Sequence, residues 1–456
     1  MKKMRLLLAF GNPYLFRETI APLIPTLAQG FEIYILLVDF HTPKSTIDQL
    51  KSWESEGRIM GYELVPNFTN SVKLFFFLKR MLPRLRSRHF DVLLTSDEVH
   101  TWTRCLSECV LPDQCVRLCF QSALSYLLRN AAIEQSFSGV DVSECLPEGV
   151  KEKHKMSLVG RGSLVSRVSD QVHRFIRKAW RWVTVRGKKD SRPSLRRLAS
   201  LYTDYIVNRI VVPWLIVHKT FPLGPYDSMT HIGSGRSDAY IFCDEVEAKV
   251  YAAIVKTPHI HVAQHPAYGQ CRCQGLQNSR SRILAPLSGV SGAQEISERQ
   301  LFLFYRDLRC VLVETCAQAV HLRIHPREKG SWHYQLKGYL RDRGIDVSLV
   351  DAEQPLREIV CDYVGVVGAL SGALRDARAS CNYAFIVGFV AVSKAYYCNP
   401  KFVYGKSEGV GWIEEDGSYD AEIFCRYEYI PPSRKSVNDI LRDSVREKFG
   451  KAFTPF

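Results

Sequence analysis

Two series of short apolar strands, each alternating with amphipathic helices, constrain the fold of this chain most strongly. In the first series the predicted helices include residues 16–29 and 74–86. The predicted strands are residues 5–10, 32–39, 92–95 and 116–120 and, after a long break, 239–244 and 259–264. Strands that alternate with helices in this way pair in parallel, so the pattern predicts a doubly wound α/β sheet.

A second series of the same kind occupies the C-terminal part. Its predicted strands are residues 282–286, 320–324, 347–350, 363–368 and 384–393. Residues 268–280, which are polar and contain glycine, read as a linker between the two series. Because 456 residues are also too many for one compact core, the sequence predicts an α/β protein with two Rossmann-like domains.

The expected domain boundaries follow from these patterns. The N-terminal domain spans residues 1–275 and the C-terminal domain spans residues 276–433. Residues 434–456 contain an amphipathic helix that we expect to return to the N-terminal domain. A basic helical insertion interrupts the N-terminal domain at about residues 147–225.

Within the insertion, residues 167–185 place apolar side chains at helical spacing among arginines and lysines. Basic amphipathic helices with tryptophans are typical of proteins that lie on anionic membranes. A helix packed within the insertion, with its basic face in solvent, explains the same pattern equally well. Both interpretations stay open.

The chain carries an excess of positive charge, which indicates the kinds of partner it could bind. Lys and Arg outnumber Asp and Glu by 61 to 47, which gives a formal net charge of +14. Such an excess favours phosphorylated substrates, polyanions or anionic membrane surfaces. We expect no nucleic-acid partner, because no recognised module is present and the aromatic residues do not alternate with basic ones in a binding pattern.

The N-terminal apolar run is short and is broken at Gly11-Asn12-Pro13, so it predicts a first strand rather than a signal peptide. No stretch approaches the roughly 20 apolar residues of a membrane span. We therefore expect a cytoplasmic protein, with peripheral attachment to the inner face of the cytoplasmic membrane as an option. The fourteen cysteines are expected to be reduced thiols, and no metal is expected, since no Asp-x-Asp pair is present to hold one.

Candidate binding residues follow two strands of the second series. His325 and Pro326 come directly after the strand at 320–324, and Ser371 and Gly372 stand between a strand and a helix. Open α/β sheets bind ligands at the carboxyl ends of their strands, and a capped helix N-terminus favours phosphate. The sequence thus predicts an imidazole and a hydroxyl that contact one phosphate, although each motif is also explained by a turn or a helix cap.

Further polar residues follow other predicted strands. Asp97 and Glu98 follow the strand at 92–95, where they are candidates for a general base or, alternatively, for residues that complement a helix dipole. Asn12 follows the first strand and is a possible cleft contact, and Glu353 could contact ribose or cytosine or cap a helix. His265, in a second His-Pro pair, is expected to have an acceptor-side or structural role.

These residues resemble the motifs of GT-B glycosyltransferases, and more narrowly those of bacterial sialyltransferases, polysialyltransferases and CMP-Kdo transferases. In those families a His-Pro pair and a serine-rich turn hold the phosphate of CMP. His325-Pro326 matches the first motif, and Ser371-Gly372 matches the second in part, because the family has two adjacent hydroxyl residues there.

The same families use two carboxylates followed by glycine as the source of the general base. Asp97 and Glu98 match the two carboxylates, while Val99 stands where the family has glycine. The resemblance implies two Rossmann-like domains that face a central cleft. It also implies an inverting, metal-independent transferase without a cofactor. Such an enzyme moves a sialic acid-like or Kdo-like sugar from a CMP donor to a saccharide acceptor, which can be lipid-linked, in surface polysaccharide, capsule or lipooligosaccharide synthesis.

The chemistry of such a reaction agrees with the residue types. Charge that develops on the departing phosphate can be stabilised by the His325 imidazolium, the Ser371 hydroxyl and helix N–H groups. The acceptor hydroxyl needs a carboxylate base within hydrogen-bond reach, which Asp97 or Glu98 would supply.

Two other functions stay open. A UDP-sugar-dependent GT-B transferase or epimerase would place a carboxylate, for which Glu353 is the candidate, on the ribose. A non-enzymatic protein that binds membrane surfaces through its basic residues would account for the charge of +14 and for residues 167–185.

Overall fold

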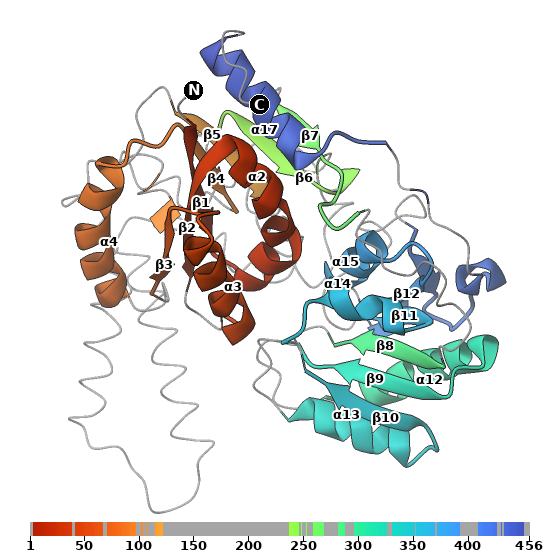
Figure 1. Cartoon of the computed structure of the whole chain (residues 1–456). Coiled ribbons are helices and arrows are strands. Elements are labelled where there is room, and N and C mark those ends of the chain that lie inside the picture. The colour runs from red at the N-terminus through yellow and green to blue at the C-terminus, as the bar shows by residue number, and fades with distance from the viewer. Residues whose placement is uncertain are drawn as a thin grey trace, which may run out of the picture.

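The computed structural model describes residues 3–38, 42–66, 71–96, 102–103, 106, 115–121, 237–245, 248, 252, 259–268, 281–287, 296–325, 331–351, 353–369, 372–392, 409–425, 430 and 433–450. Two parallel sheets with helices beside them form this part of the chain (Figure 1). The predicted insertion at about 147–225, with its basic helix, lies outside the described residues.

The first sheet contains seven parallel strands. They are β1 (Met4–Phe10), β2 (Phe31–Val38), β3 (Gly61–Val65), β4 (Val92–Thr95), β5 (Val116–Gln121), β6 (Ala239–Phe242) and β7 (Ile260–Val262). Their order is β3-β2-β1-β4-β5-β6-β7. The chain runs outward from β1 to β3 and then crosses to β4 on the other side of β1. The direction of winding therefore reverses between β1 and β4, which is where such sheets bind ligands.

The second sheet repeats this topology with six parallel strands. They are β8 (Arg282–Pro286), β9 (Ala319–Arg323), β10 (Asp346–Val350), β11 (Gly365–Gly368), β12 (Phe385–Phe389) and β13 (Gly411–Ile413). Their order is β10-β9-β8-β11-β12-β13, so the winding reverses between β8 and β11. The predicted pair of doubly wound α/β sheets is confirmed.

The helical segment between β1 and β2 changes type several times. It consists of α1 (Pro13–Leu15), the π-helical turn η1 (Phe16–Ile20), the 3-10 turn η2 (Ala21–Leu23) and α2 (Ile24–Gly30). Pro22 and Pro25 have no backbone N–H, so a continuous α-helical hydrogen-bond ladder cannot form over residues 16–29. The two other described helices that pack on this sheet before β7 are α3 (Lys44–Ser55) and α4 (Ser71–Arg86).

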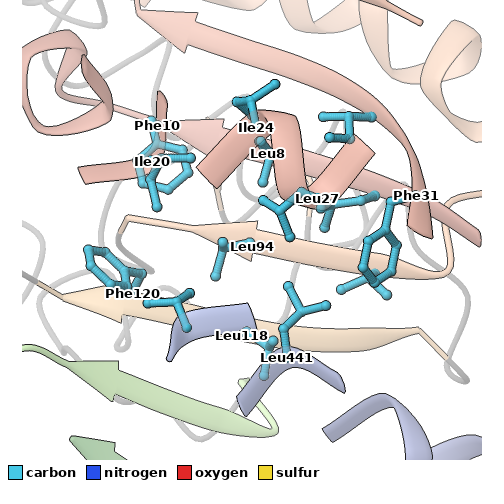
Figure 2. Close-up of a cluster of buried hydrophobic side chains, with 14 of the residues drawn as sticks. Leu8, Phe10, Ile20, Ile24, Leu27, Phe31, Leu94, Leu118, Phe120 and Leu441 are labelled. Carbon is cyan, nitrogen blue, oxygen red and sulfur yellow. The ribbon is translucent and has the colours of Figure 1, made fainter. Parts of the chain in front are cut away.

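Apolar side chains fill the space between the first sheet and its helices. One cluster joins side chains of β1, β4 and β5 to those of α2, including Leu8, Leu94, Leu118 and Leu27 (Figure 2). On the opposite face, α4 buries its own apolar side chains in a second cluster. Both faces are therefore covered, as parallel sheets require.

The last helix, α17 (Val437–Phe449), packs on the first sheet. Leu441 is fully buried in the same cluster as Leu118 (Figure 2). Lys448 Nζ donates to the carbonyl of Cys115 at 2.7 Å and lies 3.0 Å from Asp238 Oδ2. The C-terminal segment thus belongs to the core of the first sheet.

The chain passes between the two sheets twice, once after β7 and once before α17. These two places are adjacent on the first sheet, because Gln264 N donates to the carbonyl of Lys435 at 2.9 Å. Arg434 strengthens the contact, with Nη1 3.3 Å from the carbonyl of Cys243 and Nη2 3.1 Å from Glu245 Oε1.

Helices cover both faces of the second sheet as well, with one apolar cluster on each face. They are α12 (Glu298–Thr315), α13 (Trp332–Arg341), α14 (Leu356–Ile359), the 3-10 turns η7 (Val360–Asp362) and η10 (Ala421–Phe424), and α15 (Gly372–Ser380). The longest, α12, begins at a capping box in which Ser297 and Gln300 satisfy each other's backbone N–H groups.

Among the described cysteines, Cys361 is disulfide-bonded, in contrast to the expectation of reduced thiols. The free thiols in this part of the chain are Cys115, Cys119, Cys243, Cys310, Cys316, Cys381 and Cys425. Within the described ranges, no helix is both long enough and apolar enough to span a bilayer.

Candidate functional site

The loop after β1 and the end of β4 meet where the first sheet reverses its winding. Gly11 N donates to Ser96 Oγ at 3.1 Å, and Ser96 is buried. Asn12 Oδ1 accepts hydrogen bonds from the N–H groups of Tyr14 and Leu15, at 3.1 and 3.3 Å, so its side chain caps α1. The candidate bases Asp97 and Glu98 directly follow Ser96 in sequence and lie outside the described residues.

His325 and Gly372 lie at one edge of the second sheet. His325 is half-buried and follows β9, while Gly372 begins α15 after β11. Because β9 and β11 both pair with β8, the two residues stand at the carboxyl edge on either side of β8. Their predicted companions Pro326 and Ser371 lie outside the described residues.

The strands β8 and β11 approach each other closely at this edge. A Cβ atom at Gly368 would lie 3.1 Å from the carbonyl oxygen of Pro286, which is tighter than ordinary contact. Glycine, which has no Cβ atom, therefore suits this close approach at the end of β11.

Glu353 contacts the N-terminal half through its backbone. Its carbonyl oxygen accepts a hydrogen bond from Arg17 Nη1 at 2.7 Å and one from Ser45 Oγ at 3.4 Å. Its N–H donates to Asp351 Oδ1 at 3.2 Å, and the residue is exposed. The backbone of Glu353 thus joins the two halves of the chain.

A buried arginine–glutamate pair on η1 extends this contact. Arg17 donates from Nε and Nη2 to Glu18 Oε1, at 3.0 and 2.8 Å. The same oxygen is 3.4 Å from Leu356 N at the start of α14. Arg357 Nη1 donates to the carbonyl of Arg17 at 2.6 Å and lies 3.5 Å from Glu18 Oε2. The first helical turns after β1 are thus bound to the first turn of α14.

Arg323, the last residue of β9, lies beside this pair. It is buried, and Nη2 donates to the carbonyl of Gln354 at 2.6 Å. Burial lowers the pKa of its guanidinium group, while the nearby Glu18 carboxylate acts in the opposite direction. The charges of Glu18 and Arg17, in the N-terminal half, therefore act on the guanidinium group of Arg323 at the end of β9.

A second contact between the halves involves His265, the residue of the second His-Pro pair. His265 is 3% exposed, and its Nδ1 accepts a hydrogen bond from Ala267 N at 3.2 Å, so the neutral ring carries its hydrogen on Nε2. That Nε2 lies 3.3 Å from Asp376 Oδ1 on α15, close enough for attraction but not aligned as a hydrogen bond. Arg375 Nε is 3.8 Å from the same oxygen.

We name these side chains together the interdomain cluster. It comprises Arg17, Glu18, His265, Arg323, Arg357, Arg375 and Asp376. Four guanidinium groups, two carboxylates and one imidazole gather there, next to the carboxyl ends of strands from both sheets. No group of three or more His, Cys, Asp or Glu side chains in the described ranges is arranged to hold a metal ion.

Sequence patterns single out His265 but none of the other members of this cluster. Arg323 has a recognisable signal, because an arginine directly follows the buried Leu322 at the end of a strand in the second sheet. Arg17 and Glu18 stand together within an apolar helical segment, which is the same kind of signal. Their partner Arg357 is 340 residues away from Arg17, and no local spacing indicates that pairing.

Solved structures share this architecture. S. aureus MnaA, solved with UDP, matches with a TM-score of 0.51 and 10% identity, over 98% of this chain and 96% of that chain. A Methanocaldococcus jannaschii UDP-GlcNAc 2-epimerase in complex with UDP-GlcNAc and UDP has a TM-score of 0.48 and 10% identity, over 96% and 99%. A glycosyltransferase from Rickettsia africae has 0.45 and 8%, over 98% and 94%.

No protein-family model matches the sequence, and no curated protein matches it. The chain has the GT-B fold of two Rossmann-like domains, as the sequence predicts. At 10% identity the likeness to MnaA shows this fold alone. The narrower resemblance to CMP-nonulosonate transferases, and the roles of the individual site residues, stay predictions.

Proposed function

We propose that the protein is a glycosyltransferase that uses a nucleotide-activated sugar and binds the donor phosphates at the carboxyl edge of the second sheet. The interdomain cluster carries this proposal, since it places four guanidinium groups beside the strand ends of a GT-B fold. Guanidinium groups bind phosphate oxygens through paired N–H donors, and shielding from water strengthens the attraction.

The donor we propose is a UDP-activated sugar. MnaA, whose fold this chain shares, was solved with UDP, and several arginines suit the two phosphates of a nucleoside diphosphate. His325 and the N-terminus of α15 are the proposed contacts beside β8, on either side of the bound phosphates.

The second candidate is a CMP-activated nonulosonic acid. The position of His325 and Gly372 on either side of β8 favours it, because groups on two sides of one strand end suit a single phosphate. In either case, Asp97 or Glu98 is the proposed base for the acceptor hydroxyl. Ser96, which precedes them, is hydrogen-bonded to the loop after β1, where the first sheet would bind its ligand.

We propose a saccharide acceptor, carried on a lipid at the inner face of the cytoplasmic membrane. The net charge of +14 supports a location near anionic lipids. No cofactor or metal has a part in this proposal.

Thermal unfolding with UDP, CDP and CMP tests the donor. A ligand that binds only the folded state at about one hundred times its Kd stabilises the protein by about 2.7 kcal/mol, so the preferred nucleotide should raise the Tm most. We expect UDP to give the largest rise. A larger rise with CMP would favour the second candidate, and no rise with any nucleotide at millimolar concentration would contradict both.

Arg323→Gln should weaken nucleotide binding by about tenfold or more, because the variant cannot make the charge-assisted hydrogen bond that we propose from buried Arg323 to the phosphate. The matched control is Arg309→Gln, on the exposed face of α12, which should bind as the wild type does. Titration calorimetry on the folded variants measures both affinities. Equal affinities for the two variants would remove Arg323 from the donor site.

The reaction itself is tested with UDP-sugars in the presence and absence of saccharide acceptors. A transferase releases UDP and lengthens the acceptor, whereas an epimerase returns an isomeric UDP-sugar without releasing UDP. Isomerisation alone would assign the same donor site to an epimerase.

A further inference from the structure

The outer face of α4 combines exposed cations with an exposed aromatic side chain. Phe76 is 64% exposed, and the residues that follow on this face are also exposed. We define the α4 outer face as Phe76, Lys79, Arg80, Arg84 and Arg86. The opposite side of the helix is apolar and packs on the first sheet through Leu78, Met81, Leu82 and Leu85.

The spacing explains why the helix has two distinct faces. Residues 78, 81, 82 and 85 recur every three or four positions and point to the sheet, while 76, 79, 80, 84 and 86 alternate with them on the outer side. The described apolar cluster on this face of the sheet therefore contains no side chain of the α4 outer face.

The charge of this segment has one sign. Residues 71–90 contain six Lys and Arg and no Asp or Glu. One cation of the face, Arg84, lies 3.2 Å from Glu63 of β3, but the side chain of Arg84 is 53% exposed, and such surface pairs are weak. The α4 outer face thus presents a positive potential to solvent.

We infer that the α4 outer face docks on an anionic phospholipid surface, with Phe76 entering the boundary between headgroups and acyl chains. Positive charge alone would suit any polyanion, but an exposed phenylalanine among the cations suits a surface with an apolar layer below its charges. In Figure 1, α4 lies on the side of the first sheet away from the second sheet. Docking through this helix would leave the interdomain cluster uncovered.

The inference does not depend on the proposed activity, and its test uses the full-length protein. Sedimentation with vesicles of phosphatidylcholine, with or without about 30 mol% phosphatidylglycerol, measures binding. We expect binding only to the anionic vesicles, and we expect it to weaken as salt is raised, since exposed charges are screened within about 8 Å at physiological ionic strength.

Two sets of variants locate the contact. Lys79→Glu with Arg80→Glu should lower the partition coefficient by about tenfold or more, and Phe76→Ser should lower it even at low salt. The matched controls lie on α12, where Phe302→Ser and the pair Arg299→Glu with Arg309→Glu change the same residue types at exposed positions. These controls should bind vesicles as the wild type does.

Several outcomes would overturn the inference. The inference is wrong if the α4 variants bind anionic vesicles as the wild type does, or if the α12 controls lose as much binding as the α4 variants. It is also wrong if the wild-type protein binds heparin but not anionic vesicles. The Tm rise with UDP should be the same in α4 variants and wild type, so a failure here is distinguishable from a failure of the proposed donor site.

Discussion

Asp307 is a buried carboxyl group in the middle of α12, with no exposed side-chain surface. Burial raises its pKa to about 6, although the hydrogen bond from Arg306 Nε at 2.8 Å acts in the opposite direction. The folded protein therefore holds this proton in a range of pH in which the unfolded chain has lost it, because the ordinary value is 3.8. The stability that this group contributes is complete below pH 3.8 and is lost as the pH rises through about 6.

Asp307→Asn should remove this dependence on pH. Relative to the wild type, the free energy of unfolding of the variant should increase by about 2 kcal/mol between pH 4 and pH 7.5. Urea denaturation of both proteins at the two pH values measures it. A difference between variant and wild type that is the same at both pH values would show that Asp307 ionises normally.

Sequence patterns predict the positions of some residues at the site but not the contacts between domains. His325 and Gly372 follow strands, and the rule that ligands bind at strand ends places them at one edge without any knowledge of contacts. Arg17 and Arg357 meet only because two domains come together, and a single sequence carries no signal for that pairing. The pairing of Arg17 with Arg357 is therefore visible only in the structure.

Helix α17 packs on the first sheet, whose strands lie far from it in the sequence. Leu441 is fully buried beside Leu118 of β5 (Figure 2). Leu441→Ala should lower the free energy of unfolding by about 2–5 kcal/mol, since it removes buried apolar surface and leaves a cavity. The matched control Glu447→Ala, exposed on the same helix, should change it by less than about 0.5 kcal/mol. Equal losses in urea denaturation would mean that α17 does not pack as described.

The sequence pattern predicts the buried central strands but misses two strands at the sheet edges. The buried central strands are continuous apolar runs, which a sequence pattern detects directly. The two strands that the pattern misses, β3 and β13, are edge strands. β3 contains the half-exposed Glu63, and β13 has three residues, so neither has the apolar run that identifies a buried strand.

Glu18 links the two halves of the molecule because it lies between Arg17 and Arg357. Glu18→Gln would leave two mostly buried guanidinium groups without this counter-charge, and we expect a loss of about 3 kcal/mol in stability. The control Glu32→Gln breaks the partly exposed pair with Arg5 and should cost at most about 1 kcal/mol. Urea denaturation compares the two. If both variants lose the same stability, the pair at Glu18 does not join the halves.

The adjacent crossings of the chain beside β7 and α17 restrict how the two domains can move. A single covalent connection would allow one domain to turn in any direction relative to the other. Two connections that leave the first sheet at neighbouring points, beside the bond from Gln264 to Lys435, restrict such turning more than one connection does. If the two domains separate, the contacts at Glu18 and His265 separate with them, while the bond from Gln264 to Lys435 lies within the first domain and can persist.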